Sequence, residues 1–371
     1  MTRPDHHFLN SLNGTYTEFQ LRPGNDFWIA DGPWLAVDCK GEIGSISNTV
    51  YTAYKANQAR GYKSAVLVFY DEAFHSREWH EAVSLLTMAG FEHILIVDGG
   101  LRLDVQPGRF IRSRATVKHR TSPRFLVQYW QYEGLAGRDR TNLFQSLGRL
   151  ARPNRALMTC ALWERGLEPH GLISSGWGDA TLHLWQRPDF VSCVPDGYRE
   201  RLPANLGDPN HEQHSLDPKF KQCIFNLVQE THAVNIESTH HLAHNTAWAK
   251  YEQPNDRLFF TEKTAKAFAQ GQFPLFLSQP GYVEQLRFEG FDVFDDLIDH
   301  SYDTIDDLEQ RITAIADELQ RLCSKGLHHW QRQIDLKQTR LISNYHNMRN
   351  VAWQNLRLIN EELTRYRGLY E

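Results

Sequence analysis

Short apolar runs alternate with segments of helical spacing in the first hundred residues, and this alternation limits the fold more than any other feature. The apolar runs are 33–39 (PWLAVDC), 64–74 (SAVLVFYDEAF) and 93–100 (HILIVDGG). A segment of helical spacing follows each of the first two, and the second such segment ends at Gly90. Strands joined by crossover helices pair in parallel. The sequence therefore predicts an α/β domain with a parallel sheet.

Acidic residues and one histidine stand at the ends of these predicted strands. In an open parallel sheet the ligand crevice lies beyond the carboxyl ends of the strands. The acids and bases expected at that edge are Asp38, Asp71, Glu72, His75 and Asp98. Aspartates at strand ends also cap helices or accept hydrogen bonds from loop amides, so a structural role is an alternative for each of them.

A second strand and helix unit follows an arginine-rich crossing at 109–133. A strand is expected at 143–147, and a helix at 156–165 that Gly166 stops. The loop between them carries Arg149, Arg152 and Arg155. A helix start offers unpaired N–H groups and the positive end of the helix dipole, so arginines placed there favour a bound anion. A solvated basic turn is the alternative.

Further along, 223–231 reads as another buried strand, and the chain from about 327 to its end reads as helical. At 371 residues the chain is long enough for about two domains, because single hydrophobic cores stop growing near ~250 residues. We expect no membrane span, because no apolar run approaches the ~20 residues needed to cross a bilayer.

Cysteine usage and the first residues bear on location. The five cysteines are odd in number and scattered, which suits a reducing compartment. The start, MTRPDHHFLN, lacks the basic and apolar regions of a signal peptide. We therefore expect the protein in the cytoplasm, or in the host cytoplasm if it is viral. A net charge of −5 gives no general attraction to nucleic-acid phosphates.

The run 259–282 (FFTEKTAKAFAQGQFPLFLSQPGY) places an acid and a base at the start of a short predicted helix. Thr261 suits the N-cap, Glu262 and Lys263 fall in the first turn, and Gly271 ends the helix before a strand. The dipole disfavours a lysine at this position, which indicates an anionic ligand shared between Lys263 and the helix N–H groups. A neighbouring carboxylate can accept hydrogen bonds from sugar hydroxyls. An exposed lysine beside a dipole-favoured glutamate is the alternative.

The run 261–307 resembles the C-terminal donor-binding segment of fucosyltransferase-like and virus-encoded glycosyltransferases of the GT-B type. These place Thr-Glu-Lys before a helix, then a small-residue turn, a Pro-led strand and a glycine turn. The run 147–167 (LGRLARPNRALMTCALWERGL) resembles the arginine-bearing start of the donor domain in virus-encoded relatives.

The resemblance implies two Rossmann-like α/β domains that face a cleft, with a long C-terminal helical segment. The acceptor-side domain would occupy 1–135, the nucleotide-sugar donor domain 136–326, and C-terminal helices that can cross back to the first domain 327–371. Such an enzyme moves a sugar from a UDP- or GDP-sugar to an acceptor hydroxyl. No cofactor or metal is expected, and Gln270, where retaining relatives have a second carboxylate, favours inversion.

The resemblance also implies roles for individual residues. Lys263 and an arginine among Arg149, Arg152 and Arg155 would hold the donor pyrophosphate, and Glu262 would hold ribose or sugar hydroxyls. Thr261 and Thr264 would be secondary contacts. The catalytic base stays open, with Asp71, Glu72 and His75 as candidates in the acceptor-side domain.

The acceptor stays open as well: a glycan, a small molecule, or a hydroxymethylated base of viral DNA. A basic stretch could face DNA or be solvated; it comprises Arg109, Arg112, Arg114, Lys118, Arg120 and Arg124. A different class of function is a non-catalytic nucleotide- or nucleic-acid-binding protein that keeps the donor pocket without a base.

The acidic run 292–309 (DVFDDLIDHSYDTIDDLE) contains the spacing of an Asp-x-Asp metal motif. Its apolar residues Val293, Phe294, Leu297 and Ile298 recur at helical spacing, so the run is expected to be the solvated acidic face of a helix.

Overall fold

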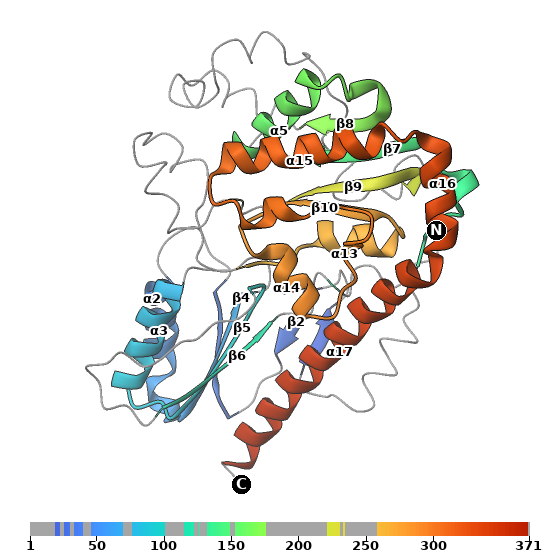
Figure 1. Ribbon diagram of the computed structural model, residues 1–371. Coiled ribbons are helices and arrows are strands. Elements are labelled where there is room, and N and C mark those ends of the chain that lie inside the picture. Colours follow the sequence, from blue (N-terminus) through green and yellow to red (C-terminus); the bar gives the residue numbers. More distant parts are fainter. Residues whose placement is uncertain are drawn as a thin grey trace. The chain divides into compact units, whose positions relative to one another are not determined.

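The computed structural model describes residues 19–22, 26–29, 33–39, 46–69, 76–100, 115–121, 126, 132–148, 153–175, 221–230, 233 and 258–369. The chain forms two compact units. Unit 1 comprises Met1–Trp130, Asp256–Glu262 and Arg349–Glu371, and unit 2 comprises Gln131–Asn255 and Lys263–Met348. Each unit has a parallel sheet with helices, and the chain ends in a long helix, so the α/β class predicted from the sequence is confirmed (Figure 1).

Unit 1 contains a four-stranded parallel sheet in the order β3-β4-β5-β6. Its strands are β3 (Leu35–Asp38), β4 (Ser64–Phe69), β5 (His93–Asp98) and β6 (Thr116–Thr121). Its helices are α2 (Ile46–Asn57), the single turn η1 (Gln58–Arg60) and α3 (Ser76–Met88). An antiparallel hairpin joins β1 (Phe19–Arg22) to β2 (Asp26–Ile29).

Helices cover both faces of this sheet, which is why β4 is buried along its whole length. Helices α2 and α3 pack on the face that bears Leu67 and Ile96 (Figure 1). His93 points to the other face, where its ring lies 5.7 Å from the ring of Tyr366 in the last helix. The strands that the sequence predicts at 33–39 and 93–100 are confirmed.

Unit 2 contains a parallel sheet in the order β10-β9-β7-β8. The strands are β7 (Asn142–Gly148), β8 (Gly171–Ser175), β9 (Cys223–Gln229) and β10 (Phe273–Leu277). Three helices follow strands of this sheet: α5 (Pro153–Glu164), α13 (Glu262–Ala269) and α14 (Tyr282–Phe288). Single turns occur at η2 (Gly137–Asp139), η3 (Glu168–His170) and η4 (Ser301–Thr304).

The strand order reverses at the middle of this sheet. From β7 the chain proceeds outward to β8 on one side, and from β9 it proceeds outward to β10 on the other. Such a reversal leaves a crevice beyond the carboxyl ends of the two central strands, because the connections that leave them diverge. The crevice of unit 2 therefore lies where β7 and β9 end.

Local sequence explains the edge of the sheet beside α13. Gly271 has a φ of 57°, and its N–H and that of Gln272 bond back to carbonyls of the last helical turn, which ends the helix as predicted. Pro274 lies in β10, which pairs only with β9. A proline lacks the N–H needed in a central strand, so an edge position suits it.

The residues from Leu308 to Gly368 are largely helical, and the helical segment predicted from about Leu327 onward is confirmed. They form α15 (Leu308–Cys323), α16 (Leu327–Leu336) and α17 (Gln338–Gly368). Asp307 caps α15 by accepting a hydrogen bond from Gln310 N. The fully buried indole of Trp330 in α16 packs edge-on against Phe225 of β9, with ring centroids 4.7 Å apart. In the part of the chain that the structure describes, no helix is both long and apolar enough to cross a membrane.

A buried arginine joins the amino ends of the strands in unit 2. The guanidinium of Arg140 donates to the carbonyls of Lys221, Cys223, Gln270 and Gly271, at 2.5 to 3.1 Å. Burial lowers its pKa to about 10, so it stays charged at neutral pH. The contacts connect the segments that lead into β7, β9 and β10.

Candidate functional site

The candidate site lies at the carboxyl end of β9, beside the start of α13. α13 begins at Glu262, so Lys263 occupies its first turn as predicted. The Lys263 Nζ lies 3.9 Å from Glu230 Oε2. Glu230 directly follows β9, and its N–H donates to Leu277 O at the end of β10. The lysine therefore reaches the crevice that the strand order creates.

Two hydroxyl groups hold the Glu230 side chain. Thr264 Oγ1 donates to Glu230 Oε1 at 2.7 Å, and Tyr282 OH reaches the same oxygen at 3.1 Å. Burial and the nearby Glu230 charge raise the pKa of Tyr282 well above its usual value, so the phenol keeps its proton and donates it. Glu230 is 1% exposed, whereas the Lys263 side chain is 19% exposed. The two hydroxyl groups therefore fix the buried carboxylate, while the Lys263 side chain remains partly exposed.

Arg155 brings a second cation to the same place. It lies in the first turn of α5, the helix that leaves the end of β7, and is 4% exposed. Its Nη2 donates to Gln229 O at 3.3 Å, and the Gln229 side chain donates to Ser146 Oγ on β7 at 2.8 Å. Arg155 and Lys263 therefore contact consecutive residues, Gln229 and Glu230, at the strand-order reversal.

The other predicted donor-binding residues divide into two groups. Thr261 is buried and Glu262 is half-buried at the start of α13, and the boundary between units 1 and 2 falls directly after Glu262. Arg149 and Arg152 lie outside the described residues. The predicted acids and bases Asp71, Glu72 and His75 also lie outside them, as does the Asp38 side chain.

Asp98 is the one strand-end acid of unit 1 whose side chain the structure describes. It is fully buried at the end of β5 and accepts hydrogen bonds from Trp79 Nε1 at 2.8 Å and from Gly100 N at 3.0 Å. Its Oδ1 also lies 2.9 Å from His119 Nε2 on β6. The sequence indicated Asp98 as a strand-end acid. Nothing in the run TVKHRT indicated that His119 is its partner, because the contact joins residues 21 positions apart.

The predicted basic stretch is described only in part. The Lys118 side chain is half-buried, and Arg120 Nη2 lies 3.1 Å from Glu362 Oε1 on α17. Arg109, Arg112, Arg114 and Arg124 lie outside the described residues.

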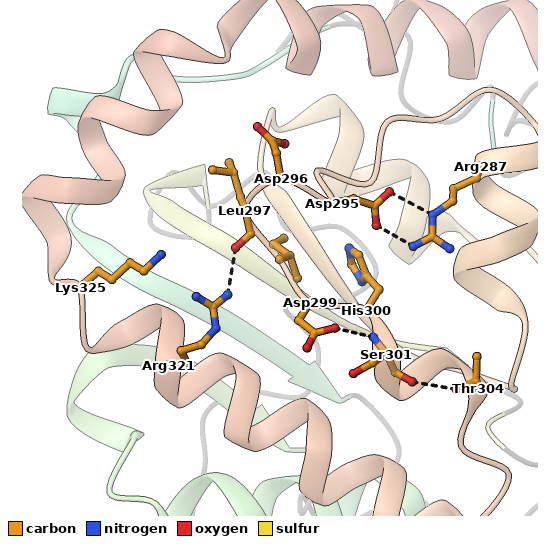
Figure 2. A pocket seen from close by; sticks show the side chains of 11 residues that line it. Arg287, Asp295, Asp296, Leu297, Asp299, His300, Ser301, Thr304, Arg321 and Lys325 are labelled. Carbon is orange, nitrogen blue, oxygen red and sulfur yellow. Dashed lines mark hydrogen bonds and ion pairs between the residues drawn. The ribbon is translucent and has the colours of Figure 1, made fainter.

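A second concavity of unit 2, with a volume of about 550 Å³, lies beside the loop 295–301 and the end of α15 (Figure 2). Several of its charged groups have partners: Arg287 forms a two-pronged pair with Asp295, and Asp299 accepts a hydrogen bond from Ser301 N. Arg321 bonds Leu297 O at 3.0 Å.

The acidic run beside this concavity is not helical between Asp292 and His300, where the single turn η4 (Ser301–Thr304) follows, so the predicted helix face is wrong. Phe294 adopts a φ of 64° and its ring packs 4.8 Å from Phe273. Asp292 pairs with Arg340, and its Oδ1 also accepts from Phe294 N. Side-chain pairs and a buried ring thus override the helical spacing of the apolar residues.

His300 is buried behind the concavity as a neutral ring. Its Nε2 donates to Val293 O at 2.8 Å, and Tyr302 OH, which accepts from Phe276 N, donates to Nδ1 at 2.8 Å. Burial lowers the pKa of His300 below its usual 6.5. Asp295 and Asp303 act to raise this pKa, and the nearby Arg287 acts with burial to lower it.

This pKa shift predicts a pH dependence of stability. Because the folded pKa is depressed, the unfolded chain binds more protons below pH 6.5, and stability falls as the pH drops through that value. We expect His300→Gln to be less stable at about pH 8 but to lose less stability than the wild type on going to about pH 5. Thermal unfolding midpoints of both proteins at the two pH values measure this difference. If the midpoint falls equally in the wild type and in His300→Gln, the prediction is contradicted.

Within the described ranges, no three histidine, cysteine, aspartate or glutamate side chains gather in a way that suits a metal ion. Comparison with known proteins adds no relative: no protein-family model, curated protein or solved structure matches the chain.

Proposed function

We propose that this chain is a glycosyltransferase that moves a sugar from a UDP- or GDP-sugar to an acceptor hydroxyl, and that the donor diphosphate binds where β7 and β9 end. One observation carries the proposal. Lys263 and Arg155 lie more than a hundred residues apart in the sequence, yet they contact the consecutive residues Glu230 and Gln229, where the strand order reverses. Ligands of open α/β sheets bind at this position.

The chemistry of the site suits a diphosphate linked to sugars. The ammonium group of Lys263 and the N–H groups at the start of α13 provide positive charge for phosphate oxygens. Glu262, beside Lys263, would accept hydrogen bonds from ribose or sugar hydroxyls. Thr264 and Tyr282 would act through Glu230, which sets the direction of the lysine.

Arg155 would contribute its charge from beneath the crevice, since it is almost wholly buried. Arg149 and Arg152, which fall between β7 and α5 in the sequence, are the other candidates for contact with the phosphates. Thr261 would be a secondary contact.

In the proposed reaction the acceptor oxygen attacks the anomeric carbon, the bond from that carbon to the diphosphate oxygen breaks, and the nucleoside diphosphate leaves with the electron pair. The cations stabilise the negative charge that develops on the leaving group. A single direct displacement inverts the anomeric centre.

Unit 2 would be the donor lobe of a GT-B arrangement, and unit 1 the acceptor lobe. The presence of a separate parallel sheet in each unit supports this division. Unit 1 would supply the catalytic base, for which Asp71, Glu72 and His75 follow β4 in the sequence. A glycan, a small molecule or hydroxymethylated DNA would be the acceptor.

A donor panel tests the proposal. Wild-type protein is incubated with UDP-glucose, UDP-galactose, GDP-mannose or GDP-fucose, with and without duplex DNA that contains 5-hydroxymethylcytosine, and release of nucleoside diphosphate is measured. We expect release from at least one donor, and with DNA as acceptor a rate that falls steeply as salt rises. Release from none of them, together with tight nucleotide binding, would favour the non-catalytic binding protein instead.

A further inference from the structure

Helix α2 and the turn that follows it bring tyrosines and cations together at the surface of unit 1. Helix α2 connects the end of β3 to the start of β4, so its last turn lies at the amino edge of that sheet (Figure 1). Residues 46–63 contain no aspartate or glutamate, so two lysines and one arginine give this segment a formal charge of +3. The tyrosine surface, as we call this group, comprises Tyr51, Tyr54, Lys55, Arg60, Tyr62 and Lys63.

Two tyrosine rings hold the ammonium group of Lys55. Its Nζ lies 5.5 Å from the centroid of the Tyr51 ring and 6.0 Å from that of the Tyr54 ring. At such distances the electron-rich face of a ring attracts a cation. Tyr54 in turn packs edge-on against the buried Phe91, with ring centroids 6.1 Å apart. Lys55 is therefore placed at the surface by a ring that is anchored in the core.

A second cation and ring follow in the turn after α2. The guanidinium carbon of Arg60 lies 5.9 Å from the centroid of the Tyr62 ring, and Arg60 Nη1 donates to Tyr62 OH at 3.0 Å. Gly61 between them has a φ of 64°, a left-handed conformation that turns the chain so that the two side chains meet. Tyr62 packs against the same core as Tyr54. Arg60 follows Lys55 by five helical residues, so roughly 10 Å of helix axis separates the two cations.

Lys63 adds a third cation beside Tyr62. Its Nζ lies 3.9 Å from Glu92 Oε1, and both side chains are more than half exposed. Exposed pairs of this kind contribute little, because water and salt screen them. Glu92 therefore lies at the margin of the tyrosine surface, and the positive charge of residues 46–63 dominates it.

The exposed parts of this surface suit nucleic acid better than a membrane. Tyr51 is 48% exposed, and exposed rings set among cations bind single strands, because bases stack on the rings and phosphates pair with the cations. A membrane-bound helix instead buries large apolar side chains. The neighbouring exposed residues of α2 and η1 are small or polar: Thr52, Ala56, Gln58 and Ala59.

We propose that the tyrosine surface binds single-stranded nucleic acid. Tyr51 stacks on a base, while Lys55, Arg60 and Lys63 pair with phosphates. Stacking and charge pairing are common to DNA and RNA, so strands of both kinds are expected to bind. This binding needs unit 1 and no sugar donor, so it goes beyond the proposed glycosyl transfer and does not depend on it.

Fluorescence anisotropy of the full-length protein with a labelled oligothymidylate of about 20 nucleotides tests the proposal. Three phosphate contacts predict that the logarithm of the association constant falls against the logarithm of salt with a slope of roughly −2, since each contact on a single strand contributes about −0.7. A duplex of the same length should bind several-fold more weakly, because its bases are already stacked. Failure to bind the single strand at low salt, or a duplex that binds as tightly, would overturn the proposal. Binding to vesicles of phosphatidylcholine and phosphatidylserine without binding to the oligonucleotide would overturn it too.

Three variants and one control place the binding on this surface. Tyr51→Ala should weaken binding of the strand by about fivefold or more, whereas Tyr51→Phe keeps the ring and should bind within about twofold of the wild type. Lys55→Gln should make the salt slope shallower by about 0.7. Lys325→Gln is the matched control, because Lys325 is also exposed and lies 5.2 Å from the centroid of the Trp330 ring, but in unit 2. Its affinity and salt slope should equal those of the wild type.

Circular dichroism melts establish that each variant folds. Unchanged affinity in Tyr51→Ala together with an unchanged salt slope in Lys55→Gln would overturn the proposal. Equal losses in Lys55→Gln and Lys325→Gln would do so as well, because the attraction would then come from charge anywhere on the chain.

Discussion

Replacing Lys263 by alanine is expected to weaken binding of UDP or GDP by about ten- to a hundredfold. A hydrogen bond to a charged group contributes about 1.5–3 kcal/mol, and each 1.4 kcal/mol is about tenfold in Kd. In the proposed site a diphosphate would bind the ammonium group of Lys263, whose Nζ lies 3.9 Å from Glu230 Oε2. Sugar transfer should fall at least as far as binding, because the charge on the leaving diphosphate grows in the transition state.

Lys221 provides a closely matched control. Its side chain is also 19% exposed and also pairs with a glutamate, Glu133, but at the amino edge of the same sheet. Lys221→Ala should bind UDP and GDP as the wild type does. Isothermal titration calorimetry measures the affinity of both variants for UDP and GDP. If both variants lose affinity equally, Lys263 does not bind the diphosphate.

Replacing Arg140 by methionine is expected to lower the free energy of unfolding by about 3 kcal/mol or more. The methionine fills the space but leaves several buried carbonyls without a donor, and an unsatisfied buried polar group costs about 1–3 kcal/mol. Those carbonyls belong to the segments that lead into β7, β9 and β10. The loss should therefore appear as unfolding of unit 2.

Arg138 lies two residues earlier in the same turn, and its side chain is 88% exposed. Arg138→Met should change the free energy of unfolding by less than about 0.5 kcal/mol. Urea unfolding followed by circular dichroism compares the two variants. If they unfold at the same urea concentration, the buried guanidinium does not hold the sheet together.

The parallel strands and most helices could be predicted from sequence because their signals are local. Runs such as AVLVF in β4 and FPLFL in β10 are continuously apolar, which is typical of strands buried on both faces. The start of α13 was predictable from Thr261 as an N-cap and Glu262 in the first turn, and its end from Gly271.

The partners of the site residues could not be predicted, because their contacts join distant segments. Glu230 meets Thr264 and Tyr282 across 34 and 52 residues, and His119 meets Asp98 across 21. The helix predicted for the acidic run 292–309 was wrong for a related reason. Arg340, 48 residues away, binds Asp292 and holds a turn where the apolar spacing favoured a helix.

The most direct test of the central claim is a thermal-shift comparison of UDP and GDP with uridine and guanosine on wild-type protein. The account predicts that at least one diphosphate raises the unfolding midpoint, since ligand at about 100 times its Kd stabilises a fold by about 2.7 kcal/mol. The matching nucleoside should have little effect, because in the proposed site the cations at the end of β9 would bind the phosphates that a nucleoside lacks. Equal shifts for nucleoside and diphosphate, or no shift with either, would contradict a diphosphate site at that position.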